Sequence, residues 1–459
     1  MDERELTDDA RTLLGNPRKA LVAMAIPMII ATIVQSANNM IDAIWVAGLG
    51  TAALAATGVA FPYFFIVMGI GNGIGVGASQ ALSRRLGAGD YEGTNRVASQ
   101  ALVMSLAAGT VVAVAMLLIV EPALIASGAG DYLEECMDYT VPIFIGIPII
   151  VLSSILSGLL RSEGASRRSM YIQLIGAGLN IVLDPIFIYI FGWGVAGAAW
   201  ATILAMSIGC LLGLYWYFVR KDTFVRIPLR GFRFDRAVDA DILRVGIPAS
   251  MEMIVMSLVM IVVNQIILLV DPVDGIAIYS TGWRVLDMLM IPAMALGFSV
   301  VPVCAAAYGT GRMDKFRDAY RYCIKLGVGI MTVVMVVALI VAPYMVSLFT
   351  YSDGTAHLAD EMVMFVRIGA LFLPTLIFGM ASAGMFQSLG MGIRSLTATV
   401  IMNVLRVPIC LFATTFGSLT ALWVGMTVSE ILGASIVAVW AVVVLRDVIA
   451  RRGTASRDH

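Results

Sequence analysis

A single carboxylate stands inside a long apolar stretch of the chain. The stretch reads LNIVLDPIFIYIFGWGVAGAAWAT over residues 179–202, and the carboxylate is Asp184. Asn180 lies four residues before it, so a helix places both side chains on one face. Pro185 has no N–H to donate to the carbonyl of Ile181, which is left free. An amide, a carboxylate and a free carbonyl together predict a site for a proton or a small cation.

The energetic cost of that carboxylate argues for a function. An acidic side chain at the centre of a bilayer costs about 2.5–3.5 kcal/mol on insertion scales. Packing does not require such a residue, because an apolar side chain fills the same space. The structural alternative is an acid that caps free backbone N–H groups at the kink before Pro185. We favour the interpretation that Asp184 binds an ion.

The composition is that of an integral membrane protein. Of 459 residues, 60% are hydrophobic and only 13% are charged, whereas soluble domains carry roughly 25% charged residues. A net charge of −1 disfavours a nucleic-acid partner. Five unpaired cysteines and two histidines give no spacing typical of a disulfide framework or a metal cluster. We therefore expect no enzyme and no resident cofactor, and the acidic N-terminus does not resemble a signal peptide.

Apolar segments long enough to span a bilayer recur with short breaks. The twelve segments lie near residues 19–46, 52–77, 97–120, 137–160, 169–191, 196–219, 243–270, 276–302, 320–346, 362–387, 395–414 and 419–445. Basic residues follow the even-numbered segments, as Arg84 and Arg85 do, and the odd-numbered connections carry acids such as Asp271 instead. The positive-inside rule then places both termini in the cytoplasm. We expect a multi-pass protein of the cell membrane.

The two halves of the chain repeat one another. Pro27 recurs as Pro248, Gly87 as Gly309, and the run LRSEGASRRS (160–169) as FQSLGMGIRS (386–395). Each half begins on the same side, so the repeat is parallel, with a pseudo-twofold axis along the membrane normal, and ligand sites in such transporters lie between the repeats. We expect an all-α fold of two six-helix bundles. The predicted parts are a cytoplasmic N-terminal segment (1–18), a first bundle (19–219), a cytoplasmic linker (220–242), a second bundle (243–445) and a cytoplasmic tail (446–459).

The acidic residues are not repeated. Asn180 corresponds to Asn403, but Asp184 corresponds to Val407. Thr202 likewise becomes Gly425, and Asp42 aligns with Val263 or Asn264, depending on a one-residue shift. An acid needed only for structure should occur in both halves or in neither. The sequence therefore predicts that ion chemistry belongs to the first bundle.

These residues resemble those of the multidrug and toxic compound extrusion (MATE) family, and most of all its prokaryotic DinF-like branch. The similarity covers essentially the whole chain. The motifs that carry it include NNMIDAIWVAGLG (38–50), GASQALSRRLGAGD (77–90), LLRSEG (159–164) and NIVLDPIFIYIFGWGVAGAAWAT (180–202). The resemblance implies a V-shaped pair of bundles around a central cleft. Such a protein exports organic cations or amphiphilic drugs by a rocker-switch exchange against H⁺ or Na⁺.

The resemblance also implies the residues that bind the coupling ion, whether H⁺ or Na⁺. They fall here on Asp42, Asn180, Asp184 and Thr202. The NorM-like branch instead has an acid in the middle of segment ten, and this chain has none there. We expect a monomer whose partners are small organic compounds and the lipid bilayer.

Further residues are candidates for supporting roles. Gln35, Asn38 and Met206 are expected to line a drug pocket, and Pro27 and Pro185 to act as hinges. A possible second acidic site combines Glu252, Arg284 and Asp287, in which Arg284 neutralises one of the two acids.

Two other classes of protein remain as alternatives. A lipid-linked oligosaccharide or lipid flippase of the same superfamily should have several cationic residues in its cleft, and only Arg284, Arg367 and Arg406 are candidates here. A membrane-embedded enzyme should have a nucleophile or a metal constellation, and the sequence shows neither pattern.

Overall fold

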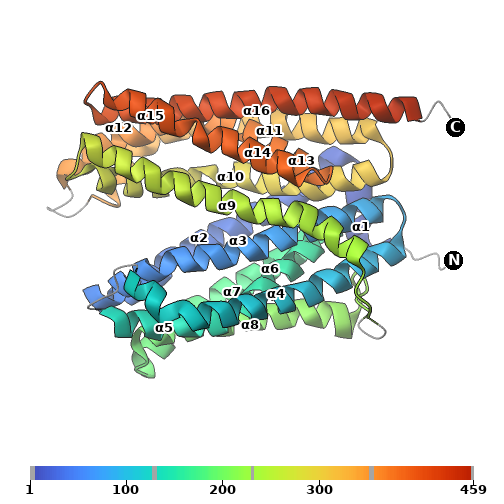
Figure 1. The fold of residues 1–459 in the computed structure, drawn as a ribbon, viewed down its shortest axis with the longest axis horizontal. Coiled ribbons are helices and arrows are strands. Elements are labelled where there is room, and N and C mark those ends of the chain that lie inside the picture. The colour runs from blue at the N-terminus through green and yellow to red at the C-terminus, as the bar shows by residue number, and fades with distance from the viewer. Residues whose placement is uncertain (1–5, 127–131, 229–231, 351–355, 456–459) are drawn as a thin grey trace.

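The computed structural model describes residues 6–126, 132–228, 232–350 and 356–455 (Figure 1). All secondary structure within these ranges is helical. Ten helices are long and apolar enough to cross a membrane, and two bent helix pairs raise the number of spans to as many as twelve. The expected all-α fold and the expected number of spans agree with this structure.

The first half of the chain forms one bundle. Its helices are α1 (Asp8–Leu14), α2 (Pro17–Ala47), α3 (Thr51–Gly87), α4 (Tyr91–Ala126), α5 (Leu133–Ile145), α6 (Ile147–Ser162), α7 (Ser166–Pro185) and α8 (Gly194–Leu214), with π-helical turns η2 (Ile186–Ile190) and η3 (Tyr215–Arg220). α5 and α6 make one span, bent by 49°. The bend lies at Gly146, and Pro148 follows it at the start of α6, where a missing N–H costs nothing.

The second half repeats this arrangement. Its helices are α9 (Arg236–Val270), α10 (Gly275–Gly309), α11 (Met313–Ser347), η4 (Ala356–Leu358), α12 (Ala359–Ala370), α13 (Leu373–Ser388), α14 (Gly392–Val404), α15 (Arg406–Thr414) and α16 (Leu419–Ala455). α12 and α13 form the second bent span, at 51°. Each half thus bends its fourth span by nearly the same angle, which supports the duplication seen in the sequence.

The two bundles lie side by side and contact one another through α2, α3, α9 and α10 (Figure 1). Both chain ends lie at one end of the molecule, on the right of the view. The connections there carry the arginines and lysines of the even-numbered breaks, so we call it the basic end and the opposite end the acidic end. The ribbons of the two bundles converge toward the basic end and diverge toward the acidic end.

Glycines allow the bundles to approach closely at the basic end. A Cβ on Gly87 of α3 would overlap the carbonyl oxygen of Ala306 on α10, and a Cβ on Gly309 of α10 would overlap the carbonyl oxygen of Arg84 on α3. The repeat that relates Gly87 to Gly309 also relates Arg84 to Ala306. α3 and α10 therefore cross at two equivalent points, with no room for a side chain at either.

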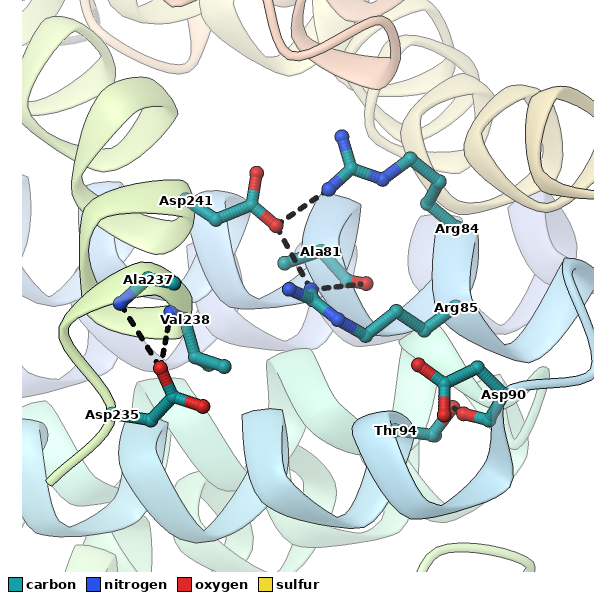
Figure 2. Close-up of polar contacts among 9 residues, drawn as sticks. All are labelled: Ala81, Arg84, Arg85, Asp90, Thr94, Asp235, Ala237, Val238 and Asp241. Carbon is teal, nitrogen blue, oxygen red and sulfur yellow. Dashed lines mark hydrogen bonds and ion pairs between the residues drawn. The ribbon is translucent and has the colours of Figure 1, made fainter. Parts of the chain in front are cut away.

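An ion-pair cluster joins the bundles beside this crossing (Figure 2). Arg84 and Arg85 of α3 both donate to one carboxylate oxygen of Asp241 on α9, at 2.6 and 2.8 Å. The three side chains are mostly buried. A separate pair, Arg18 of α2 with Asp318 of α11 at 2.7 Å, joins the bundles at a more exposed position. The basic end is therefore closed by both backbone packing and charge.

The second bundle begins earlier than the expected boundary at residue 243. α9 starts at Arg236, because the Asp235 side chain caps it by accepting hydrogen bonds from the backbone N–H groups of Ala237 and Val238 (Figure 2). The connection before it is also more structured than a free linker, since Phe224 and Val225 are buried.

Glu163, at the end of α6, anchors this connection. Its carboxylate is 1% exposed and accepts a hydrogen bond of 2.8 Å from the backbone N–H of Val225. The Tyr217 hydroxyl lies 3.5 Å from the other carboxylate oxygen. Burial raises the pKa of Glu163 to about 8, while the Val225 N–H and the Arg168 guanidinium oppose that shift. The folded protein thus holds a proton on Glu163 that the unfolded chain releases near its ordinary pKa.

We predict that Asp241→Asn favours opening of the basic end. The variant removes the charge shared by Arg84 and Arg85, and hydrogen bonds to charged groups contribute roughly 1.5–3 kcal/mol each. Spin labels at the exposed positions 92 and 321, one in each bundle, should report a larger fraction of long distances. Asp314→Asn is the matched control, because the ion pair that Asp314 makes among the described residues is with Arg312, two residues before it in the same bundle. An unchanged distance distribution in Asp241→Asn would contradict the role of this cluster.

Glu163 makes a second prediction, on stability against pH. Its folded pKa of about 8 lies above the ordinary value of 4.5, so between these values the folded state binds more protons than the unfolded state. Its contribution to stability therefore falls as pH rises through that window and levels off above it. Glu163→Gln keeps the contact with Val225 and removes the titration. Its thermal stability in detergent should fall less from pH 5.5 to pH 8.5 than that of the native protein, and parallel curves would refute the prediction.

Candidate functional site

Three helices bring the predicted ion-site residues together. Within α7, Asn180 donates from its Nδ2 to Asp184 Oδ1 at 2.7 Å, across one helical turn. The same nitrogen lies 3.4 Å from Thr202 Oγ1 on α8. Asn180 and Asp184 are buried, at 4% and 0% exposure. The spacing read from the sequence therefore produces a direct amide–carboxylate contact.

Asp42 of α2 completes this group. Its carboxyl group faces that of Asp184 closely enough for the two to share a hydrogen bond when one of them is protonated. Tyr139 of α5, which sequence reasoning did not single out, lies within electrostatic range of both acids. The cluster thus draws on α2, α7 and α8, with Tyr139 of α5 nearby, and α7 and α8 contribute an amide and a hydroxyl group.

Asn38 belongs to the same cluster, although the sequence analysis placed it in a drug pocket. Its Nδ2 donates to Asn180 Oδ1 at 2.9 Å, and its side chain is 6% exposed. Asn38 precedes Asp42 by four residues, as Asn180 precedes Asp184. The repeated Asn-x-x-x-Asp spacing was the signal in the sequence that could have identified it.

The cluster has an excess of acceptors. Asn38 Oδ1, Asp42 Oδ1 and Asp184 Oδ2 are all buried and have no partner within the chain as described. A buried oxygen without a partner costs about 1–3 kcal/mol. Every unmet requirement in this group is for a donor or a positive charge. A proton or a monovalent cation fits that requirement, and an anion does not.

Pro185 ends the regular α-helix next to the cluster. The chain continues as the π-helical turn η2, which is frequent at functional sites. Tyr189 of this turn donates from its hydroxyl to the carbonyl of Trp45 at 2.6 Å, and the two rings pack edge to face. The turn thus fixes the end of α2 that carries Asp42. Pro27, the other expected hinge, lies within α2, which remains one helix from Pro17 to Ala47.

The other residues expected in a drug pocket lie apart from this hydrogen-bonded group. Gln35 is exposed on α2 and donates to Asn39 at 3.1 Å. Met206 of α8 is partly buried and packs against an apolar cluster of the first bundle that includes Ile147.

The possible second acidic site differs from the expected arrangement. Glu252 of α9 accepts a hydrogen bond of 2.6 Å from Ser395 of α14, and Gln387 of α13 lies 3.5 Å away. Asp287 is hydrogen-bonded by Trp283. Within the described ranges, no ion pair joins Arg284 to either acid. Instead of an ion pair with Arg284, each acid has a hydrogen-bond partner of its own, Ser395 for Glu252 and Trp283 for Asp287.

The comparison with protein families gives one match. The family model MatE matches residues 27–186 and 248–412, one stretch in each bundle. The two stretches correspond to the two repeats. They include the residues of the polar cluster on α2 and α7, but not Thr202 of α8.

Curated relatives and solved structures are similar over nearly the whole chain. The multidrug export protein MepA of Staphylococcus aureus (strain MRSA252) is 28% identical over 94% of this chain and 94% of its own. MepA of Staphylococcus haemolyticus (strain JCSC1435) is 29% identical over 91% of this chain and 93% of its own. A multidrug resistance MATE family transporter solved in an outward-facing conformation is 36% identical, with a TM-score of 0.93 over 97% of this chain and 99% of that one. A MATE crystal structure in complex with MaL6 has a TM-score of 0.94 at 36% identity, over 96% of this chain and 99% of the other.

The position of Asn38 predicts a stability effect. Asn38→Ala leaves the buried Asn180 Oδ1 without its donor, which should cost about 1–3 kcal/mol of unfolding free energy. Asn39→Ala is the control: Asn39 is exposed and bonds to Gln35, so this change should stay within about 0.5 kcal/mol. Thermal unfolding of the purified variants in one detergent measures both. Equal stability of the two variants would mean that the Asn38–Asn180 bond contributes nothing.

Proposed function

Because the chain belongs to the MatE family, we propose that it is a secondary transporter that exports organic compounds in exchange for H⁺ or Na⁺. The export of multiple drugs is supported by the names of its curated relatives and of the similar solved structures. The exchange is supported by the polar cluster of the first bundle.

The single observation that carries this proposal is the set of unpartnered buried oxygens on Asn38, Asp42 and Asp184. Two carboxyl groups and an amide oxygen, buried together among membrane-spanning helices, call for a positive charge. A proton shared by the two carboxyl groups meets the requirement. So does a Na⁺ ion held by oxygens of Asp42, Asn180, Asp184 and Thr202, since Na⁺, like other hard cations, prefers oxygen ligands.

The proposed cycle uses the two ends of the molecule. The basic end faces the cytoplasm, by the positive-inside rule, and its closure by α3, α9 and α10 leaves the acidic end as the route for exchange. An ion that arrives from outside neutralises the cluster, changes the affinity of the outward-facing state for its cargo, and is carried inward when the bundles rock. Exchange of this kind is a coupling free energy between two ligands.

The cargo is expected to be a small cationic or amphiphilic compound. Exposed apolar side chains occur on one helix of each bundle that packs against the other bundle, with Ile33 and Met40 on α2 and Met256 and Met260 on α9. Methionine adapts to ligands of different shapes, which suits a broad range of drugs. Gln35 and Met206 remain candidates for contacts with such a ligand.

Transport of a lipid-linked oligosaccharide is less well supported. Pyrophosphate recognition needs available cationic side chains, and Arg406 is ion-paired with Glu430. Arg367 is exposed and donates to the carbonyl of Leu339 at 3.2 Å.

Asp184→Asn and Asp42→Asn test the proposal. Each variant removes one negative charge from the cluster with almost no change in volume. We expect export of a fluorescent cationic dye to fall by roughly tenfold or more, since that factor corresponds to about 1.4 kcal/mol of lost coupling. The amount of protein in the membrane should not change, and Asn39→Ala serves as the control. Full export by both variants would disprove the site.

The identity of the ion can be decided with proteoliposomes. Dye transport is driven first by a pH gradient alone and then by a Na⁺ gradient alone. Exchange against H⁺ predicts transport in the first case only, and exchange against Na⁺ predicts it in the second only. Transport in neither case, by protein that binds the dye, would rule out ion exchange.

A further inference from the structure

The second bundle contains a buried ion pair of its own. Arg406, the first residue of α15, pairs with Glu430 of α16. The two residues are 8% and 7% exposed. The guanidinium also lies over the ring of Trp283, 5.6 Å from its centroid. Removing two charges from solvent requires such compensation, so each side chain serves as the counter-charge of the other.

A small aromatic pocket surrounds the pair. Trp283 of α10, Phe365 and Phe372 from the bent fourth span, and Trp423 of α16 line it together with the two charged side chains. Phe365 packs edge to face against Trp423, with ring centroids 4.8 Å apart. The aromatic rings exclude water and supply a favourable surface for a cation.

The repeat relates this pocket to the polar cluster of the first bundle. Asn403 corresponds to Asn180, and Val407 stands where Asp184 stands. By the same offset Arg406 corresponds to Leu183, and Glu430 to Ser207. The second bundle has therefore lost the acid next to its asparagine and gained a cation at the neighbouring position. Asn403 donates within its own helix, to the carbonyl of Thr399 at 2.9 Å.

The unmet hydrogen bonds of the two pockets are opposite in kind. Buried atoms without a partner in the first cluster are oxygens, as described above. In the second pocket they are the donors Arg406 Nε and Trp423 Nε1. The first pocket thus needs a positive charge, whereas the second already contains one.

Stability alone does not account for the pair. Replacing a buried ion pair by apolar residues of similar volume is often neutral or stabilising. The first bundle shows that the fold tolerates an apolar residue at this position, since Leu183 occupies it.

We propose that Arg406 is a tethered cation, which takes in the second bundle the role that the mobile coupling ion has in the first. Glu430 is its fixed counter-charge. Because this carboxylate is already neutralised, the pocket around Arg406 and Glu430 does not bind H⁺ or Na⁺. Of the two places that the repeat relates, only the cluster of the first bundle then responds to the coupling ion. The inference rests on the proposed ion site at Asp42 and Asp184.

Carboxyl labelling by dicyclohexylcarbodiimide tests the proposal. This reagent reacts with protonated carboxyl groups in apolar surroundings, and peptide mass spectrometry assigns each label to a residue. The purified full-length protein should be labelled at Asp42 or Asp184 and not at Glu430. In Na⁺-free buffer, Glu430 of Arg406→Leu has lost its counter-charge and must take up a proton, so its labelling should rise roughly tenfold or more. Arg406→Lys keeps the charge and should leave Glu430 unlabelled.

The other titratable groups near Arg406 are Tyr279 of α10 and Cys410 of its own helix. Neither is a carboxyl group, so neither gives rise to the label that is assigned to Glu430. The double variant Arg406→Leu/Glu430→Leu removes both charges and serves as the folding control. Should Arg406→Leu fail to fold, Arg406→Gln removes the charge and keeps a polar contact.

The outcomes separate this proposal from the proposed function. Labelling of Glu430 in the native protein, or its absence in a folded variant that lacks the Arg406 charge, overturns the tethered cation. Absence of label at both Asp42 and Asp184, with Glu430 behaving as expected, instead counts against the ion site of the first bundle.

Discussion

The structure depends on one constraint: a polar atom buried among membrane-spanning helices must find a partner. Most of the chain obeys it through helical backbone hydrogen bonds. The cluster between α2, α7 and α8 departs from it, since Asn180 already uses its amide to hold Asn38, Asp184 and Thr202 and three oxygens of the cluster are left without a partner among the described residues. Because the remaining unpartnered atoms are all oxygens, the kind of ligand follows from the hydrogen-bond count and not from the family. In the second bundle an arginine of the chain itself supplies the positive charge beside Glu430.

The sequence was sufficient to predict the part of the site that lies on a single helix. Asn180 and Asp184 are separated by one turn, so any helix would bring them together. The resemblance supplied Asp42 and Thr202, which lie on other spans. Asn38 has the same relation to Asp42 that Asn180 has to Asp184, an amide one helical turn before an acid. The sequence therefore contained the signal for it as well.

Residues whose partners are distant in the chain could not be predicted in the same way. Sequence separation alone does not select a partner for Glu252, whether Arg284 or another residue. Only the packing of α9 against α13 and α14 decides that Ser395 is its partner. The sequence around Glu430 did not predict its partner, since no basic residue lies one helical turn away. The twelve spans and the duplication were predictable because they rest on hydropathy and spacing. The start of α9 lies before the predicted segment, because its first residues are charged and do not fit the apolar pattern of a membrane span. The helix begins there because Asp235 caps it.

The geometry of α2 connects the polar cluster near the acidic end with the closed basic end. This helix carries Asn38 and Asp42 near the acidic end, and Arg18, paired with Asp318 of the other bundle, at the basic end. Between them the sulfur of Met28 accepts a hydrogen bond from Ser299 of α10. At the basic end the backbones of α3 and α10 meet at Gly87 and Gly309 with no space to spare. Such a contact is either made or broken and has no intermediate form. A change of charge beside Asp42 therefore acts on α2, and α2 also takes part in the contacts that close the basic end. A closure with two states is what the proposed exchange of two ligands requires.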